Sequence, residues 1–324
     1  MAVPQITVVG SYATGLTMKV QRLPSTGETL LGTGYRVDYG GKGSNQAVGS
    51  ARLGAKVNFI ARIGKDAFAQ MALRLYRDEG IDVTQVREMD GAPTGVGFIM
   101  VEAATGNNCI VIDPGANEWL TADDVSGCAA AFQTAAVVLT QLEIPVAAAE
   151  ASLLRGRATG AITILNPAPV RQLSQSVLQL VDVLTPNQVE AKVLAGLSPD
   201  ADIEPVELGR ELIRRGVKQV VMTRGEKGAL IVTSSSSTHV PAISVSAVDS
   251  TGAGDAFNAG LATALASGSS LEAAVQFAVV AGGLAVTREG VIPSLPSRDE
   301  IRHFCRQNGM PIPDWFAGDP VPLQ

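Results

Sequence analysis

The sequence predicts an α/β fold: a doubly wound, mostly parallel sheet with helices on both faces, together with a small β-sheet lid. Short apolar runs alternate with helical patterns along most of the 324 residues, which is typical of the crossover units of a parallel sheet. Two stretches, 17–39 and 94–112, are β-rich with no helix between their strands. They interrupt the alternation, so we expect them to leave the main sheet.

Strands of the main sheet are expected where short runs rich in Val, Ile and Leu occur, because strands covered on both faces form continuous apolar segments. These runs lie at 6–9, 57–60, 136–139, 162–165, 181–184 and 220–222. Helical patterns separate them at 44–52, 66–79, 205–215, 254–266 and 271–286. The predicted core therefore comprises residues 1–16, 40–93 and 113–310.

The two β-rich stretches, 17–39 and 94–112, form the predicted lid. The second contains the segment 104–108, Ala-Thr-Gly-Asn-Asn, between two strand-like runs, which indicates a hairpin. A small sheet with one apolar face needs a cover, so it would lie over a site or make a dimer contact. An edge extension without function explains the pattern equally well.

The charge balance excludes several classes of partner. Lys and Arg number 25 and Asp and Glu number 31, which gives a net charge of −6. Nucleic-acid grooves and anionic membrane surfaces need clustered basic residues instead. The most apolar long stretch, 125–149, contains Gln, Glu and Pro and is too polar to span a bilayer. We therefore expect a small-molecule partner, with no nucleic acid and no membrane.

Cysteine and histidine usage narrows the chemistry further. Cys109, Cys128 and Cys305 are widely separated and fit neither a disulfide framework nor a metal site, which favours a reducing compartment. The N-terminal residues lack the basic segment of a signal peptide, so we expect a cytoplasmic protein. The two histidines, His239 and His303, lie in no zinc-hydrolase pattern, and the sequence has no nucleophile elbow or P-loop.

The strongest chemical motif is a glycine-rich turn that opens the helix predicted at 254–266. Gly252 and Gly254 allow a tight turn and leave backbone amides uncovered at the positive end of the helix dipole, where a phosphate could bind. Asp255 would stand at the same helix start and could take a proton from an attacking hydroxyl group. An acidic residue in a first helical turn is also favoured by the dipole alone.

Two further motifs begin helices. Asn187 followed by Glu190 resembles a capping box, which needs no ligand, but Asn187 could contact a phosphate while Glu190 orders water around Mg²⁺. The glycine-rich segment 40–45 could hold a polyhydroxylated ligand through close backbone approach and the Asn45 amide. It could equally be a tight turn that Asn45 caps.

Two strand ends also carry polar residues. Glu143 follows the strand predicted at 136–139, and the segment 223–228 follows the strand predicted at 220–222. Open α/β sheets bind ligands at the carboxyl ends of their strands. The Glu143 carboxylate could therefore hold a sugar hydroxyl, or it could be an exposed strand-end charge.

These motifs, in this order between residues 10 and 294, resemble those of the ribokinase-like (PfkB) carbohydrate kinase family. The matching segments are 10–11, 41–47, Glu143, 166–169, 187–190, 223–228, 249–255 and 287–294. Each motif alone is weak, whereas the ordered set is specific. The resemblance implies ATP-dependent phosphorylation of the primary hydroxyl of ribose or a related pentose-like sugar. It also implies a homodimer whose contact is made by the lid.

The resemblance implies a role for each matching residue. Asp255 is expected to be the catalytic base, with an anion hole at Gly252, Ala253 and Gly254. ATP contacts are expected at Asn187, Thr223, Gly225 and Gly228, with Glu190 serving Mg²⁺. The sugar is expected at Gly41, Lys42, Gly43, Asn45, Glu143 and Asp255. A monovalent cation, usually K⁺, is expected at Asp249, Thr251, Ala285, Arg288, Gly290 and Ser294, several of them acting through backbone carbonyls.

One segment departs from the family pattern. Family members carry Asn-x-Asp shortly after the first strand, where both side chains hold sugar hydroxyls, but the corresponding residues here are Ala13 and Gly15. Each such hydrogen bond is worth about 1 kcal/mol, and a buried hydroxyl left unpaired costs roughly 1–3 kcal/mol, so ribose could lose roughly tenfold to several hundredfold in affinity. This favours a deoxygenated, differently configured or bulkier acceptor.

Other functions remain open from the sequence. A nucleoside kinase of the same superfamily could use the space left by the missing side chains for a base. A sugar-binding regulator could keep the fold without turnover, although Asp255 beside an intact glycine turn argues against it. A phosphofructokinase-like role is disfavoured, because little besides Lys42 offers a cation for a substrate phosphate near the expected sugar site.

Overall fold

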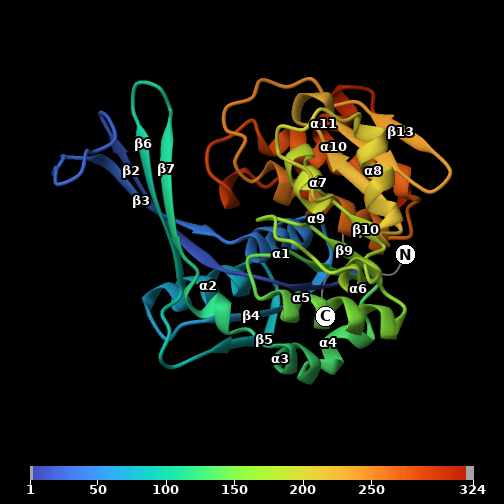
Figure 1. Ribbon diagram of the computed structural model, residues 1–324, viewed down its shortest axis with the longest axis horizontal. Helices are drawn as coiled ribbons and strands as arrows, with labels where there is room; N and C mark the ends of the chain where they lie inside the picture. Colours follow the sequence, from blue (N-terminus) through green and yellow to red (C-terminus); the bar gives the residue numbers. More distant parts are fainter. Residues whose placement is uncertain (1–2, 319–324) are drawn as a thin grey trace.

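A four-stranded sheet projects from a larger body in which helices cover both faces of a longer sheet (Figure 1). The computed structural model describes residues 3–318, so residues 1 and 2 of the predicted core lie outside the described residues. The predicted class, a mostly parallel α/β sheet with a separate small sheet, is confirmed.

Within residues 3–318, nine strands form the large sheet in the order β13-β12-β11-β10-β9-β8-β1-β4-β5. Their bounds are β1 (Gln5–Val9), β4 (Lys56–Ile63), β5 (Asp82–Glu88), β8 (Val137–Thr140), β9 (Ile162–Leu165), β10 (Val183–Leu184), β11 (Gln219–Thr223), β12 (Ala229–Val232) and β13 (Ser237–Val240). Pairing is parallel from β5 to β11 and antiparallel at β12 and β13. The strand order reverses between β1 and β8, which is where open α/β sheets bind ligands.

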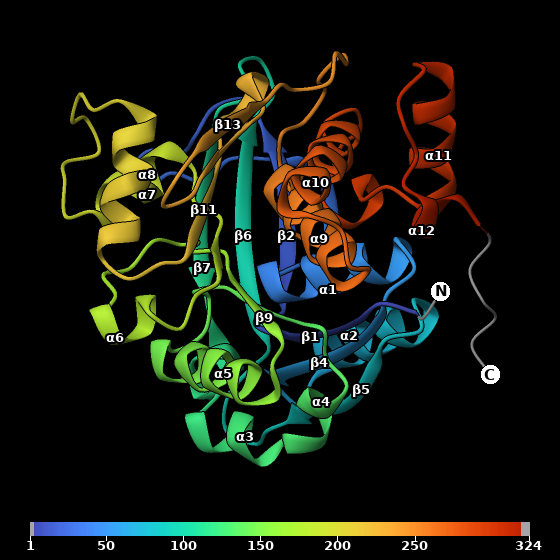
Figure 2. The same cartoon turned by 90° about the vertical axis from the view of Figure 1, so that its right-hand side faces the viewer.

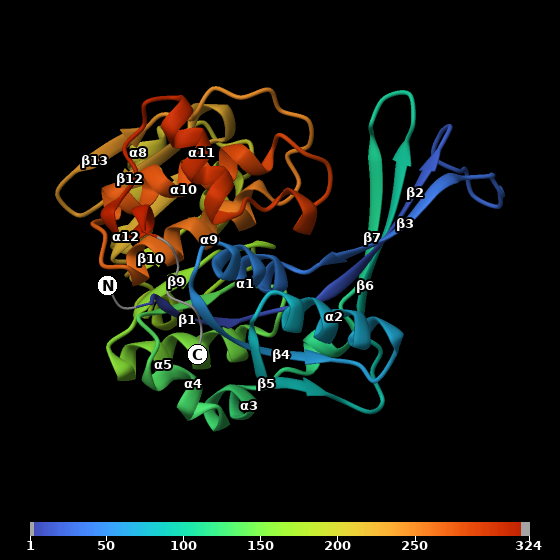
Figure 3. The ribbon, with the colours of Figure 1, turned by 180° about the vertical axis from the view of Figure 1, so that it is seen from behind.

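Two apolar cores lie on the two faces of this sheet. One packs under α1 (Lys42–Arg52), α2 (Ala67–Asp78), α9 (Ala253–Ala266), α10 (Leu271–Ala285), α11 (Arg298–Gln307) and α12 (Asp314–Ala317). The other packs under α3 (Ala122–Gly127), α4 (Ala129–Gln133), α5 (Val146–Thr159), α6 (Gln175–Leu178), α7 (Gln188–Leu194) and α8 (Pro205–Arg214). Figure 3 shows α9 and α10 on one side of β1 and α3, α4 and α5 on the other.

The central strands are mainly apolar because both of their faces are covered. Val8 belongs to the first core and Val9 to the second, since successive side chains of a strand point to opposite faces. All four residues of β8 are buried for the same reason. Burial on both sides leaves the strand ends as the place where polar residues of this sheet can meet a ligand.

The small sheet has the order β3-β2-β6-β7, and Figure 2 shows β2, β6 and β7 behind the helical body, on the side away from the viewer. Its strands are β2 (Ala13–Val20), β3 (Thr33–Gly40), β6 (Gly95–Glu102) and β7 (Asn108–Asp113). β2 pairs with β6 in parallel, and the other two pairs are antiparallel. The hairpin predicted at 104–108 joins β6 to β7, with Gly106 at a φ of 75° that glycine adopts without strain.

The start of β2 differs from prediction. β2 begins at Ala13 instead of Thr17, because pairing with β3 and β6 extends an Ala-Thr-Gly segment that has little strand propensity of its own. The serine-rich segment after β12 leads into β13, which pairs with β12 at the edge of the large sheet. No helix among the described residues is long and apolar enough to cross a membrane.

Candidate active site

Polar residues gather at the carboxyl ends of the central strands, where the strand order reverses. Ser11 follows β1, Glu143 follows β8 and Asn166 follows β9, while Asn187 lies beyond β10 and Thr223 ends β11. Parallel strands present their carboxyl ends at one edge of a sheet, so these residues share one region of the molecule. Helices α1 and α9 begin at this same edge.

Asp255 lies in the first turn of α9 with only 6% of its surface exposed. Two side-chain amides from α1 hold its carboxylate: Asn45 Nδ2 donates to Oδ2 at 2.8 Å, and Gln46 Nε2 donates to Oδ1 at 2.9 Å. These bonds fix the carboxylate, and each oxygen keeps a further lone pair that can accept a proton, as a general base requires.

Gln46 links Asp255 to two further strand ends. Its Oε1 accepts a hydrogen bond from Gln141 Nε2 at 2.6 Å, and its Nε2 also donates to Asn166 Oδ1 at 3.0 Å. Gln46 and Gln141 are both fully buried. Gln46 was not predicted as a site residue, because its only signal in the sequence is a polar side chain next to Asn45 in the glycine-rich segment.

The glycine turn opens α9 as predicted. Gly252 is the N-cap with a φ of 82°, and a Cβ at this position would lie 2.7 Å from Val291 Cγ1. A Cβ at Gly254 would meet nothing within 4 Å, so this residue borders open space. Of the three expected anion-hole amides, Ala253 N donates to Ser250 O at 3.3 Å, whereas the amides of Gly252 and Gly254 have no partner among the described residues.

A cavity of about 220 Å³ adjoins this turn. It is lined by Lys42, Asn166, Ala168, Thr185, Asn187, Glu190, Thr223, Ser250, Gly252, Gly254, Asp255 and Asn258. The carboxylate of Asp255 raises the pKa of Lys42 above its ordinary value, against the effect of burial, with help from Glu143 and Glu190. Lys42, expected at the sugar, thus places its charge beside the residues expected to contact phosphate.

Asn187 and Glu190 form the capping box that their spacing predicts. Asn187 Oδ1 accepts from Glu190 N at 2.8 Å, and Glu190 Oε2 accepts from Asn187 N at 2.8 Å. Burial raises the pKa of Glu190, although the Asn187 amide and Lys42 act in the opposite direction. Because both residues also line the cavity, capping and ligand contact are compatible here.

A second cavity of about 500 Å³ shares Thr223, Ser250 and Gly254 with the first. Gly225 and Gly228 line it on one side, and its other walls are mainly apolar: Ile243, Phe257, Val279 and Val286. A mainly apolar pocket next to a candidate anion site suits a nucleoside attached to phosphates. The structure therefore brings Thr223, Gly225 and Gly228 together, as expected for nucleotide contacts.

The expected sugar-binding residues lie on the other side of Asp255. Glu143 Oε2 accepts from Ser11 Oγ at 2.6 Å and from Lys42 N at 2.8 Å. Asn45 Oδ1 is buried with no hydrogen-bond partner among the described residues, so it is available to a ligand hydroxyl. Gly41 and Gly43 provide the close packing: a Cβ on either would lie within 2.6 Å of the backbone of residues 10–12.

The loop expected to hold a monovalent cation is closed by Asp249. Its Oδ1 accepts from Thr251 N at 2.9 Å and its Oδ2 from Gly290 N at 3.1 Å. Burial alone would raise the pKa of Asp249, but these hydrogen bonds and the Arg36 guanidinium hold it below its ordinary value. Ala285 is the last residue of α10 and is buried; it lies five residues before Gly290 in the chain.

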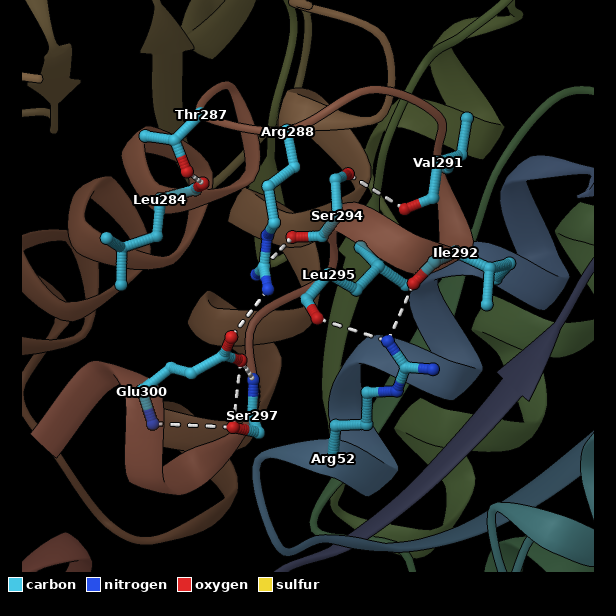
Figure 4. A network of polar contacts seen from close by, with 10 residues as sticks. All are labelled: Arg52, Leu284, Thr287, Arg288, Val291, Ile292, Ser294, Leu295, Ser297 and Glu300. Atoms are coloured by element: carbon cyan, nitrogen blue, oxygen red, sulfur yellow. Dashed lines mark hydrogen bonds and ion pairs between the residues drawn. The ribbon is translucent and has the colours of Figure 1, made fainter. Parts of the chain in front are cut away.

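Arg288 and Arg52 fix the rest of this loop (Figure 4). Arg288 Nη2 donates to Ser294 O at 3.0 Å and also pairs with Glu300, while Arg52 Nη1 donates to Ile292 O at 2.6 Å. The carbonyl of Ser294, one of the expected cation ligands, therefore already accepts a hydrogen bond. The remaining oxygens of the loop suit an alkali cation, which prefers such hard donors.

Among the described residues, protein side chains alone do not form a complete set of metal ligands at the candidate site. Within residues 3–318, no group of three or more His, Cys, Asp or Glu residues could hold a metal ion. Glu190 and Asp255 supply carboxylates to the cavity. This donor set fits Mg²⁺ that keeps its waters and is carried by phosphate oxygens.

Comparison with known proteins agrees with this arrangement. A family model described as pfkB family carbohydrate kinase matches residues 3–298. A ribokinase of Haemophilus influenzae is 36% identical over 299 residues, covering 92% of this chain and 97% of the relative. A deoxyribokinase of Salmonella typhimurium is 34% identical over 304 residues, covering 94% and 99%. The structure of Arabidopsis thaliana ribokinase complexed with ribose and ATP matches with a TM-score of 0.85 at 31% identity, covering 94% of this chain and 98% of that chain.

Proposed function

The chain belongs to the pfkB family of carbohydrate kinases, and we propose that it transfers the γ-phosphoryl group of ATP to the primary hydroxyl of ribose, deoxyribose or a related pentose-like sugar. It is an ATP-dependent carbohydrate kinase. The observation that carries the proposal is the buried Asp255 carboxylate, which two amides hold beside the unpartnered backbone amides of Gly252 and Gly254.

Asp255 acts as the general base. As the sugar oxygen bonds to phosphorus and the bond to the ADP oxygen breaks, the hydroxyl proton passes to the Asp255 carboxylate. Asn45 and Gln46 keep both carboxylate oxygens in place for this transfer. Such positioning accounts for much of the rate in phosphoryl transfer, where the protein does little covalent chemistry.

Other groups that line the cavity stabilise the charge on the phosphates. The amides of Gly252 and Gly254 and the ammonium group of Lys42 border the same space as Asp255. Donors that are fixed in advance where negative charge develops contribute the largest single share of many rate enhancements. We assign Asn187, Thr223, Gly225 and Gly228 to ATP, and Gly41, Gly43, Asn45 and Glu143 to the sugar.

Two cations complete the proposal. Mg²⁺ would neutralise phosphate charge, with Glu190 ordering its water shell. K⁺ would bind at the loop of Asp249, Thr251, Arg288 and Gly290, where hydrogen bonds from the loop hold the pKa of the Asp249 carboxyl below its ordinary value. Replacing K⁺ by tetramethylammonium should lower kcat, and indifference to this exchange would reject the cation site.

We also propose that the small sheet is a lid and a dimer contact. Its exposed apolar residues include Phe98, Ile110, Val111 and Ile112, which a second copy of the sheet could cover. A cytoplasmic location follows from the need for ATP.

A screen of ATP consumption over pentoses, deoxypentoses, hexoses, polyols and nucleosides tests the proposed reaction. Phosphorylation of pentoses supports it, whereas turnover with nucleosides alone would favour a nucleoside kinase. Asp255→Asn should lower kcat by roughly 10²- to 10⁴-fold while ATP affinity is retained. Asp299→Asn, which removes an exposed carboxylate from the first turn of α11, is the matched control. Equal turnover in both variants would reject Asp255 as the base.

A further inference from the structure

One face of the small sheet is directed towards the cation loop. Gly15 on β2 pairs with Asp38 on β3 and with Gly97 on β6, so these three positions share a face. Arg36, two residues before Asp38, lies on the same face, and its Nη1 is 3.5 Å from Oε2 of Glu289 in the cation loop. This contact turns the face towards the active site.

The same face borders the expected sugar-binding residues at the base of the sheet. β2 leaves the core directly after Tyr12, one residue beyond Ser11, whose Oγ contacts Glu143. β3 ends at Gly40, immediately before the start of α1, the helix that carries Asn45. An acceptor held between Glu143, Asn45 and Asp255 would therefore lie against the start of β2 and the end of β3.

Gly15 and Gly97 leave open space in front of this face of the small sheet. A Cβ at Gly97 would meet nothing within 4 Å, and a Cβ at Gly15 would meet only ordinary contacts, Ile99 Cδ1 at 3.6 Å and Asp38 Cβ at 3.7 Å. Two paired glycines thus leave a hollow with Asp38 at its side. Because glycine has no side chain, Gly15 and Gly97 offer no side-chain hydrogen bond to a ligand in the hollow. A polar ligand there needs a hydrogen-bonding group from a neighbouring residue.

Asp38 can supply this hydrogen-bonding group. Its Oδ2 lies 3.3 Å from Nε of Arg36, and its side chain is 33% exposed. No hydrogen bond to Oδ1 is made by the described residues, so this oxygen can accept from a ligand hydroxyl. The ion pair with Arg36, which is itself anchored on Glu289, restricts the orientation of the carboxylate.

The surrounding charges favour a neutral ligand. Asp38, Glu289 and Asp249 are acidic. Arg36 pairs with Asp38 and Glu289 and helps to lower the pKa of Asp249, so it offsets one of these three negative charges. A sugar acid or sugar phosphate would be repelled by the remaining excess of negative charge. Hydroxyl groups, in contrast, donate well to a carboxylate.

We propose that Asp38 determines acceptor specificity by accepting a hydrogen bond from a hydroxyl of a neutral sugar that occupies the hollow over Gly15 and Gly97. The carboxylate is supplied from β3, across the strand pair from the position where β2 has none. This inference rests on the proposed function, because it concerns the acceptor of the same reaction.

The test measures coupling between Asp38 and individual acceptor hydroxyls. Wild type, Asp38→Ala and Asp38→Asn are compared on the acceptor with the highest kcat/KM and on its series of monodeoxy analogues. Asp38→Ala should raise the KM for the acceptor roughly tenfold to a hundredfold, as expected for a hydrogen bond to a charged group, with the KM for ATP unchanged. One analogue should lose this penalty, because its missing hydroxyl is the partner of Asp38.

Two variants separate recognition from a structural role. Glu28→Gln changes a carboxylate in the connection between β2 and β3 that also pairs with an arginine, Arg22, and should leave the acceptor KM unchanged. Arg36→Gln removes the partner of Asp38 but keeps the carboxylate, so the hydroxyl-specific coupling should persist. Thermal unfolding checks each variant, and the near-isosteric Asp38→Asn serves if the alanine variant fails to fold.

The outcomes distinguish the two proposals. Penalties that stay additive for every hydroxyl would overturn the role of Asp38 while kinase activity stands. If wild type phosphorylates no carbohydrate, the proposed function fails, and the same cycle measured by calorimetric acceptor binding still tests Asp38. Hydroxyl-specific coupling in either assay supports it.

Discussion

Gln46→Met tests whether the amide network of α1 positions the catalytic carboxylate. The substitution keeps the length of the side chain but removes the 2.9 Å hydrogen bond to Asp255 Oδ1 and the 2.6 Å hydrogen bond from Gln141. Asp255 keeps its second bond, from Asn45 Nδ2. We therefore expect the carboxylate to remain in the site with greater freedom to rotate.

The size of the effect follows from these contacts. A hydrogen bond to a charged group contributes about 1.5–3 kcal/mol, and each 1.36 kcal/mol of transition-state free energy corresponds to about a factor of ten in rate. We expect kcat to fall roughly tenfold to a hundredfold. The KM for ATP should change little, because Gln46 is not among the residues that line the nucleotide cavity.

Steady-state kinetics on the preferred acceptor measure this loss. Gln70→Met is the matched control, because it removes the 2.9 Å amide-to-carboxylate hydrogen bond between the exposed residues Gln70 and Glu88, away from the site. Both variants are checked by thermal unfolding. A folded Gln46→Met enzyme with the kcat of wild type would refute the positioning role, as would an equal loss in the control.

Two further predictions follow from local contacts. Gly254→Ala should fold with an unchanged or slightly higher melting temperature, because a Cβ there meets nothing within 4 Å. The substitution should nevertheless lower kcat by about a hundredfold, because the added methyl group would cover an amide of the proposed anion hole. A wild-type kcat would contradict this assignment. Burial tends to raise the pKa of Asp124, but Arg62 and Thr121 lower it from 3.8 to about 2. Asp124→Asn should therefore destabilise the fold by about 1–2 kcal/mol at neutral pH, and the difference should vanish as the pH falls from about 4 to about 2 in denaturant titrations.

The sequence predicted the catalytic half of the site because its chemistry is local. The turn from Gly252 to Asp255 contains the proposed anion-binding amides and the proposed base within one helix start, so spacing along the chain reports spacing in the structure. The pair Asn187 and Glu190 is likewise local. The two hydrogen bonds of its capping box are as predicted. That both residues line the cavity could be inferred only because the carboxyl ends of parallel strands meet at one edge of the sheet.

Contacts between distant segments were less accessible to prediction. Lys42 lies in the segment expected to hold the sugar, and only the packing of α1 against α9 shows that its charge faces Asn187 and Glu190. Gln46 looked like an ordinary polar residue of α1. Its role depends on three partners, from three separate elements, that no spacing rule relates to it.

The acceptor side depends on strand register, which explains why Asp38 escaped the sequence analysis. A slip of one residue between β3 and β2 would turn Asp38 and Arg36 to the opposite face. The close approach where β3 meets α1 supports this register, because a Cβ on Gly41 would lie 2.6 Å from the Cα of Tyr12. The glycine that precedes α1 therefore helps to determine which side chains of β3 face the proposed acceptor site, and we propose that acceptor specificity is encoded jointly by the turn and the strand.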